Sequence, residues 1–353
     1  MPGPSDPITT AFAGPIQIDQ LRRWQGLWLD HLGFGPEPTP SRVVLERPGM
    51  RLHVYDGASG PPLLIVPAPI KRAYLWDLAP EASVVRRCVE AGLAVHLIEW
   101  TDPQGEVTGY GLTDYADRMI GACREAVAAA TGTMRVALAG HSLGGTLAAL
   151  HAALYPDRVR GLVLVEAPLR FGAAAGAFAP LVAATPEALI QAVGKAGTVP
   201  GSLIDVISVT AAPDTFSGER LVDGLASSTD PAWLRLHLRV VRWTLDEFPL
   251  PGPLFAEIVQ RLYKEDRFAC GTLELGGRRV DPTALTIPVL TVVNPESRII
   301  PPVSVLCPLN APTVLTYRGD PGVALRHVGA LVGRSAHDTL WPAILNWLGH
   351  LPL

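Results

Sequence analysis

The sequence has little cysteine and little charge. Its four cysteines, Cys88, Cys123, Cys270 and Cys307, are scattered, with no Cys-x-x-Cys pair and no histidine at ligand spacing. This argues against a disulfide framework or a zinc site, and we expect buried free thiols. Charged residues make up 18% of the chain, the formal net charge is −4, and no basic run is present. Nucleic acid and anionic membranes are therefore not expected partners.

No stretch has the pattern of a secretory signal or of a membrane span. The N-terminus lacks a basic start followed by a continuous apolar run. The longest apolar region, Val136 to Tyr155, is interrupted by His141, Ser142, His151 and several glycines, which is typical of a buried strand followed by a core helix. We therefore expect a cytoplasmic protein without a transmembrane segment.

What the chain does contain is a regular alternation of strand and helix patterns. Hydrophobic residues make up 48% of the 353 residues, enough for a large core. Short, β-branched apolar runs predict strands at Arg42–Glu46, Arg51–Tyr55, Leu63–Val66, Ala94–Ile98, Val136–Ala139, Leu162–Val165, Val289–Val293 and Thr313–Tyr317. Helical patterns lie at Ile16–Leu32, Ser83–Ala91, Leu112–Ala129 and Gly145–Tyr155. This order predicts an α/β fold with a mostly parallel, doubly wound sheet.

The alternation stops between about Phe171 and Ala284, where the sequence is helical, apolar and aromatic. We therefore expect three regions. Residues 1–60 form an N-terminal extension, with a helix laid on the core and a hairpin. Residues 61–170 and 285–353 form the core. Residues 171–284 form a cap, or lid, inserted after the sixth strand.

The strongest chemical signal is the segment Gly140-His141-Ser142-Leu143-Gly144, a Gly-x-Ser-x-Gly box between a predicted strand and a predicted helix. In this context the box is typical of the nucleophile elbow of the α/β-hydrolase fold. The serine occupies a sharp turn, and glycines on both sides leave room for it. Ser142 is the predicted nucleophile.

The same motif predicts where an oxyanion would bind. The amide of Leu143 lies at the start of the predicted helix and can donate to the oxyanion. A second donor is expected from the loop after Leu63–Val66, which reads Pro67-Ala68-Pro69-Ile70. Proline has no N–H group. Ala68 and Ile70 therefore remain, and we favour the amide of Ile70.

The base is expected near the C-terminus, because the order in this fold is nucleophile, acid, histidine. We favour His327 over His337, which lies in the last predicted helix. The acid is open among three alternatives. Glu166 ends an apolar strand, Glu296 follows the next strand, and the site could also function with no acid, because the acid orients the base and does not react.

Ten short segments resemble the polyhydroxyalkanoate synthase family of α/β-hydrolases. They are Pro61–Pro67, Tyr74–Leu78, Val84–Arg87, Val95–Trp100, Gly144–Thr146, Tyr155–Val159, Leu250–Pro253, Ile299–Pro302, His327 and Trp341-Pro342. The resemblance covers most of the chain, from about Thr39 to Leu348. It implies that Ser142 replaces the cysteine nucleophile of the family and that His327 is its histidine. The family aspartate falls on Ser297, while Glu166 falls on an uncharged position, which is the pattern of a relocated acid.

These features predict an enzyme that forms an acyl-serine intermediate. Because an oxyester passes its acyl group on less readily than a thioester does, we expect hydrolysis of a carboxylic ester or thioester. Candidate substrates are a hydroxyalkanoate oligomer and an acyl-coenzyme A. One alternative is a synthase-like acyltransferase, and another is a non-catalytic relative that binds polyester granules or a synthase. No metal or cofactor is implied. A homodimer and a polyester granule surface are the candidate partners.

Overall fold

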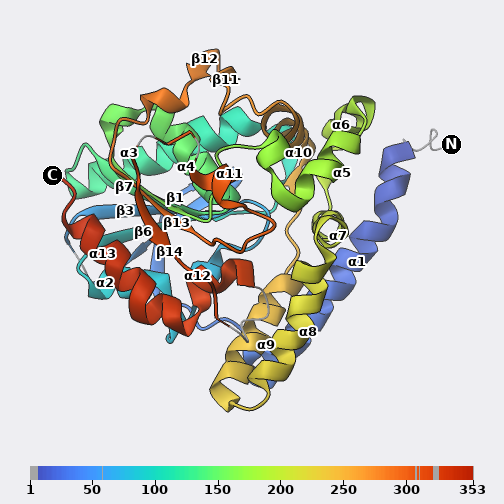
Figure 1. The fold of residues 1–353 in the computed structure, drawn as a ribbon, viewed down its shortest axis with the longest axis horizontal. Coiled ribbons are helices and arrows are strands. Elements are labelled where there is room, and N and C mark those ends of the chain that lie inside the picture. The colour runs from blue at the N-terminus through green and yellow to red at the C-terminus, as the bar shows by residue number, and fades with distance from the viewer. Residues whose placement is uncertain (1–6, 58, 307, 310, 321–325, 353) are drawn as a thin grey trace.

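The computed structural model describes residues 7–57, 59–306, 308–309, 311–320 and 326–352. An eight-stranded sheet with the order β1-β2-β6-β3-β7-β8-β13-β14 lies at the centre (Figure 1). Its strands are β1 (Ser41–Arg47), β2 (Met50–Tyr55), β3 (Pro62–Val66), β6 (Ala94–Trp100), β7 (Val136–His141), β8 (Val159–Val165), β13 (Val289–Val293) and β14 (Thr313–Thr316). Each of the eight strands expected from the sequence is present.

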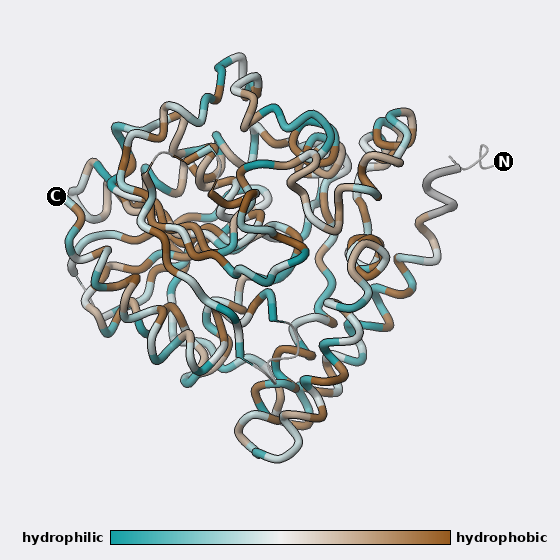
Figure 2. The backbone as a smooth tube through the Cα atoms, in the orientation of Figure 1, coloured by the Kyte–Doolittle hydropathy of each residue, from teal (hydrophilic) through white to brown (hydrophobic). Residues whose placement is uncertain are grey.

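The sheet is parallel from β6 to β14, whereas β1 and β2 form an antiparallel hairpin that extends it through β2 and β6. The hairpin of the predicted N-terminal extension is therefore continuous with the core sheet. The inner strands are apolar on both sides: on β3, Leu64 and Val66 enter one hydrophobic cluster, while Leu63 and Ile65 enter another. Figure 2 shows the same concentration of hydrophobic residues along the central strands.

Helices cover both faces of the sheet. On one face lie α3 (Ile120–Thr131) and α4 (Leu143–Leu154), and on the other lie α2 (Val84–Glu90), α12 (Gly329–Val332) and α13 (Trp341–Gly349). The remaining α-helices of the described residues are α1 (Pro7–Leu29), α5 (Ala179–Ala184), α6 (Glu187–Gly194), α7 (Gly201–Ala211), α8 (Glu219–Ser227), α9 (Pro231–Leu245), α10 (Gly252–Glu257) and α11 (Pro302–Leu306). This is the doubly wound arrangement expected from the sequence.

The segment between β8 and β13 is mainly helical, but it also contains short strands. These are β9 (Thr198–Val199) with β10 (Leu250–Pro251), and the hairpin β11 (Leu273–Leu275) with β12 (Arg278–Val280). Elsewhere, β4 (Asp77–Ala79) pairs with β5 (Ala82–Ser83). The end of the segment packs on the core, because Leu273, Leu275 and Val280 are buried in the same cluster as Leu147 of α4.

The N-terminal helix α1 lies against the inserted helices α7 and α9 rather than along the sheet (Figure 1). Asp19 of α1 accepts hydrogen bonds from the amides of Gly201 (3.0 Å) and Ser202 (2.8 Å), the first two residues of α7. One helix thus caps the N-terminus of another that is distant in sequence. The expectation of a helix laid on the core is corrected here: α1 is built into the inserted helices.

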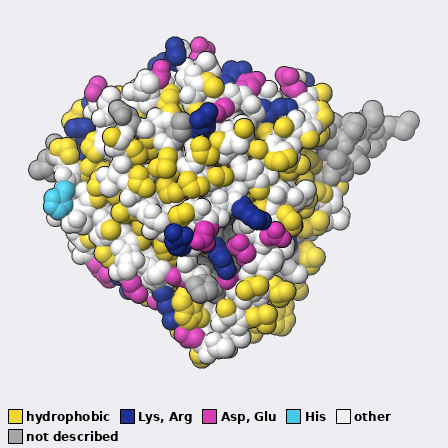
Figure 3. Space-filling view, viewed as in Figure 1, with side chains coloured by type: hydrophobic (Ala, Val, Ile, Leu, Met, Phe, Trp, Pro, Cys, Tyr) yellow, Lys and Arg dark blue, Asp and Glu magenta, His cyan; other side chains and the backbone are white. Residues whose placement is uncertain are grey.

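Two helices of this region present apolar side chains to solvent. On α1 they are Ile16, Ile18, Leu21, Trp24, Leu27 and Trp28, and on α8 they are Leu221, Val222 and Leu225. In Figure 3, hydrophobic side chains gather at the lower right, where Figure 1 places α8 and α9. An exposed apolar surface of this kind is typical of an interaction site. The expected homodimer or granule partner stays a prediction.

Two further expectations concern the thiols and the membrane. Cys88 and Cys123 are buried free thiols, Cys270 is exposed, and Cys307 lies outside the described residues. No single helix in the described part of the chain is long and apolar enough to cross a bilayer. One bent pair, 176–184 with 187–194, reaches the required length and apolarity when the two helices are taken together.

Candidate active site

The predicted nucleophile occupies the turn between β7 and α4. Ser142 has φ 52° and ψ −133°, a conformation that non-glycine residues rarely adopt and that typically costs about 1–3 kcal/mol. Its amide donates to the carbonyl of Val165 at 3.0 Å, which ties the turn to the end of the neighbouring strand β8. This strand–turn–helix geometry is the one expected of a nucleophile elbow.

Glycines make this turn sterically feasible. A Cβ on Gly140 would come within 3.0 Å of the backbone of Gly144 and Gly145. A Cβ on Gly145 would meet Ala167 and the carbonyl of Gly140 within the same distance. The spacing in the sequence motif therefore reflects close contact between the strand end and the first turn of α4.

The loop after β3 lies directly beside the first turn of α4. A Cβ on Gly144 would come within 3.0 Å of the carbonyl oxygen of Val66, the carbonyl carbon of Pro67 and the amide nitrogen of Ala68. Ile70, further along the loop, packs against the core cluster that contains Leu143. The structure thus brings together the two segments from which oxyanion donors are expected. The roles of the Leu143 and Ile70 amides stay predictions.

Glu166 and His327 come together beside the turn. Glu166 immediately follows β8, is only 1% exposed, and donates its backbone amide to the carbonyl of Val292 at 3.0 Å. His327 lies in η11 (Arg326–Val328). Its Nδ1 is 3.6 Å from Glu166 Oε2. Two residues separated by most of the core sequence therefore form an acid–imidazole pair.

Burial disfavours charge on both members of this pair. Among the described residues, neither carboxylate oxygen of Glu166 nor Nδ1 of His327 has a hydrogen-bond partner. Desolvation raises the pKa of Glu166 to about 8, with nearby His141 opposing the rise, and it lowers the pKa of His327 to about 4. Near neutral pH the pair therefore favours a protonated carboxyl beside a neutral imidazole. A neutral imidazole is the form that can accept a proton from a serine.

A second histidine completes the group and was not singled out as functional from the sequence. The Nε2 atom of His141 is 2.9 Å from the backbone oxygen of His327, and the two ring centroids are 4.5 Å apart. Burial, together with the neighbouring His327 ring, lowers the pKa of His141 to about 3, so the ring is neutral and Nε2–H donates. Its position directly before Ser142 was the available sequence signal.

The other candidates lie elsewhere. Glu296 has a side chain that is 64% exposed and pairs with Arg318 at 2.6 Å, so this alternative acid does not contact His327. Ser297, at the position of the family aspartate, accepts a hydrogen bond from the amide of Ile300 at 3.1 Å. The Nδ1 atom of His337 accepts one from Arg87 at 2.9 Å. Of the two carboxylates left open by the sequence, Glu166 is the one beside the imidazole.

The fold and this strand–turn–helix site define an α/β-hydrolase. The chain belongs to the alpha/beta hydrolase fold family, whose model matches residues 11–200. Two solved structures share the fold: the enol-lactonase from Burkholderia xenovorans LB400 (TM-score 0.51, 12% identity, 88% of this chain and 100% of that one) and the Paleococcus ferrophilus monoacylglycerol lipase (TM-score 0.51, 16% identity, 85% and 98%).

Within this class, the chain is similar to the poly(3-hydroxyalkanoate) polymerase subunit PhaC. It is 30% identical to the Haloferax mediterranei protein over 319 residues, which are 88% of this chain and 63% of that protein. It is 29% identical to the Allochromatium vinosum protein, with 88% of each chain covered. The resemblance to the polyhydroxyalkanoate synthase branch is confirmed, and with it the expectation of an enzyme.

Proposed function

We propose that the chain is an acyltransferase of the polyhydroxyalkanoate polymerase type that works through an acyl-serine intermediate on Ser142. The juxtaposition of Glu166, His327 and the turn at Ser142 carries this proposal. Similarity to PhaC proteins over 88% of the chain supports 3-hydroxyacyl thioesters as the substrate class and acyl transfer as the reaction. The relatives thus favour the acyltransferase alternative over hydrolysis, which the sequence ranked first.

In the proposed first half-reaction, His327 accepts the proton of Ser142 as the serine oxygen attacks the thioester carbonyl. The amides of Leu143 and Ile70 donate to the oxyanion that forms. The tetrahedral intermediate then collapses, the C–S bond breaks, and the imidazolium of His327 returns the proton to the leaving thiolate. The products of this step are a free thiol and a 3-hydroxyacyl ester of Ser142.

In the second half-reaction, the hydroxyl of another 3-hydroxyacyl unit attacks the carbonyl of the acyl-serine ester. His327 removes its proton, the new ester bond forms, and Ser142 leaves with that proton. During both steps a positive charge develops on His327. The carboxylate form of Glu166 stabilises this charge and holds the ring in position, and this form becomes more populated as the pH rises toward the raised pKa of Glu166, about 8. Burial of Glu166 strengthens this interaction, because few other dipoles compete for the carboxylate.

Hydrolysis is the second candidate, and the identity of the nucleophile favours it. The resemblance implies a cysteine where this chain has Ser142. An acyl-serine is an oxyester, which transfers its acyl group less readily than a thioester does. With water in place of the acceptor hydroxyl, the same residues release a free hydroxy acid.

Two measurements on the purified chain test the proposal. A fluorophosphonate probe is expected to label the wild type, with mass spectrometry placing the adduct on Ser142, and not to label Ser142→Ala. Incubation with 3-hydroxyacyl-coenzyme A then separates the two reactions, since transfer yields ester-linked oligomers and hydrolysis yields the free acid. A folded wild type that is not labelled would instead support the non-catalytic, granule-binding alternative.

A further inference from the structure

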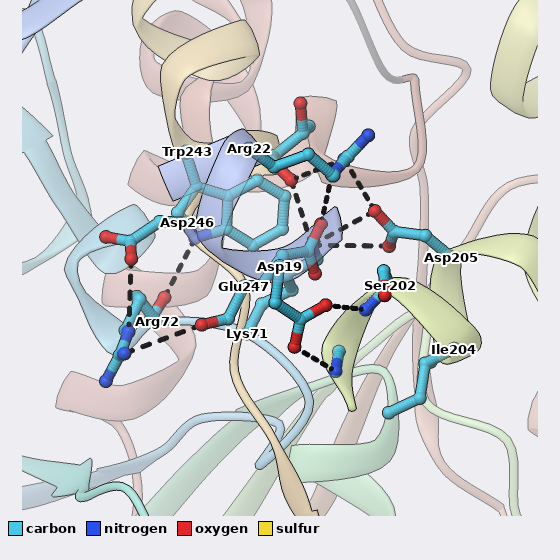
Figure 4. A network of polar contacts seen from close by, with 12 residues as sticks. Asp19, Arg22, Lys71, Arg72, Ser202, Ile204, Asp205, Trp243, Asp246 and Glu247 are labelled. Carbon is cyan, nitrogen blue, oxygen red and sulfur yellow. Dashed lines mark hydrogen bonds and ion pairs between the residues drawn. The ribbon is translucent and has the colours of Figure 1, made fainter. Parts of the chain in front are cut away.

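The loop after β3 is held by an ion cluster that lies outside the acid–imidazole pair. Glu247 follows α9, and its side chain is 0% exposed. Its carboxylate receives Arg22 of α1 and Lys71, the latter at 2.9 Å. Both cations also pair with Asp205 of α7, at 2.7 Å from Arg22 and 3.2 Å from Lys71. Figure 4 shows this network from close by.

Lys71 and the next residue, Arg72, directly follow Ile70 in the loop. Lys71 also donates to the carbonyl of Thr244 at 2.9 Å. Arg72 pairs with Asp102 at 2.7 Å, and its backbone carbonyl accepts the indole N–H of Trp243 at 2.9 Å. Side-chain and backbone contacts therefore fix the chain immediately after the expected oxyanion donor. These contacts occupy the charged groups of both Lys71 and Arg72.

Glu247 is placed in this network with little room to move. A Cβ on Gly201 would come within 2.7 Å of Glu247 Oε2, so the first residue of α7 must lack a side chain for the carboxylate to reach Lys71. A buried carboxylate is costly unless it is paired, and burial raises the pKa of Glu247 while Lys71 opposes the rise. Buried ion pairs of this kind fix the positions of their side chains, whereas their net contribution to the free energy of unfolding is small.

The opposite end of the loop is fixed by a different contact. Val66, Pro67 and Ala68 press against Gly144 in the first turn of α4, so that end is held by backbone packing. The end that carries Ile70 is tied to the inserted helices through Lys71 and Arg72, while the Ile70 side chain packs against the core cluster that contains Leu143. The direction of the Ile70 amide therefore depends on where the ion cluster holds Lys71.

We infer that Glu247 is a positioning residue: by holding Lys71, with Arg22 as its second partner, it keeps the loop of residues 67–70 in register with Ser142. The inference rests on the proposed function, because it assigns the loop to the oxyanion site. It makes α1 and the inserted helices part of the catalytic geometry. A loss of this contact then affects the transition state more than the binding of substrate.

The experiment compares Glu247→Gln, Lys71→Met and the double variant with the wild type. The matched control is Glu37→Gln, which removes one charge by breaking the pair of Glu37 with the buried Arg239 of α9 and shares no partner with Lys71, Arg72 or Glu247. Five quantities are measured: kcat and KM on a nitrophenyl ester, the thermal midpoint, and the affinities for a trifluoromethyl ketone and for its methyl ketone analogue. The trifluoromethyl ketone forms a tetrahedral adduct that needs the oxyanion donors, and the methyl ketone reports ground-state binding.

The expected result is a fall in kcat of about tenfold or more in each single variant, since small misplacements of a site are costly, with KM within about twofold. Affinity for the trifluoromethyl ketone falls by the same factor, and that for the methyl ketone does not. The double variant is no slower than the slower single variant, because both remove the same contact. Lys71→Arg restores most of kcat. Arg22→Gln, at a partly exposed position, provides a second test if Glu247→Gln does not fold.

Variants with kcat within twofold of the wild type would overturn the inference. The inference would also be overturned if kcat fell in proportion to the thermal midpoint, and by the same proportion in Glu37→Gln, because the cluster would then be purely structural. Failure of the fluorophosphonate probe to label the wild type is a separate outcome, which overturns the proposed function itself.

Discussion

The Nε2–H group of His141 donates to the backbone carbonyl of His327 at 2.9 Å. This contact joins the residue before the candidate nucleophile to the candidate base, although 186 positions separate them in the chain. It fixes the tautomer of His141 and holds the backbone of the short helix η11 against the turn at Ser142. The same contact provides an indirect way to test the site.

His141→Phe is expected to lower kcat about tenfold, because the phenyl ring fills the space but leaves the carbonyl of His327 without its donor. A buried acceptor without a partner costs about 1–3 kcal/mol, and about 1.4 kcal/mol corresponds to a tenfold change. His141→Gln, whose side-chain amide can donate in place of Nε2, should stay within about threefold of the wild type. Steady-state kinetics on a nitrophenyl ester check this. Equal activity of the two variants would contradict the role of the hydrogen bond.

At pH 8.5, where the carboxyl of Glu166 is mostly ionised, Glu166→Gln is expected to lower kcat by about 10²–10⁴-fold, because a neutral amide cannot stabilise the imidazolium of His327. KM should change much less. Glu296→Gln is the matched control, as it removes the same charge from an exposed carboxylate paired with Arg318. This control should retain kcat within about twofold. Comparable losses in both variants would mean that the acid is not Glu166.

The stability of the wild type relative to Glu166→Gln should fall as pH rises from about 4.5 to about 8. In this window the folded state keeps the proton on Glu166, whose pKa is raised to about 8, while the unfolded state has released it. The free energy of unfolding of the wild type, relative to that of Glu166→Gln, therefore decreases as pH increases. Urea unfolding of both proteins at pH 5 and pH 8.5 measures the change in this difference, expected to be on the order of 4 kcal/mol. A constant difference across this range would indicate that Glu166 is already charged at pH 5.

Gly144→Ala is expected to destabilise the fold by about 1–3 kcal/mol, the usual cost of overpacking. The new methyl group would meet the backbone of Val66, Pro67 and Ala68, which cannot rotate away as a flexible side chain could. Activity should fall with stability, because both contacting segments belong to the site. Gly218→Ala is the control: its φ is −65° and nothing lies within 4 Å of its Cβ position. That variant should be neutral or slightly stabilising, as judged by urea midpoints.

Much of the fold could be predicted from the sequence because its signals are local. Buried parallel strands require short β-branched runs, and all eight predicted runs are strands of the sheet. The turn at Ser142 requires small neighbours, and the glycine spacing reveals it. The chain order of this fold then pointed to His327 as the base.

The acid could not be chosen from the sequence, because Glu166 and Glu296 both follow strands of the sheet. The difference lies in the environment each carboxylate reaches, which is the buried side of His327 for Glu166 and the surface beside Arg318 for Glu296. The contacts that hold the loop after β3 through Lys71 could not be predicted from the sequence either. It depends on Arg22 and Glu247, and a single ion-pairing residue has no local pattern that identifies its partner.

The sequence by itself therefore determined the strands, the turn and the candidate nucleophile, since each follows from the steric and hydrophobic requirements of neighbouring residues. The tertiary structure alone decided which carboxylate meets the imidazole, that His141 holds the His327 backbone, and that α1 joins the inserted helices above the loop after β3. These relationships arise from packing between segments far apart in the chain, where burial and distance determine which charges and hydrogen-bonding groups become partners.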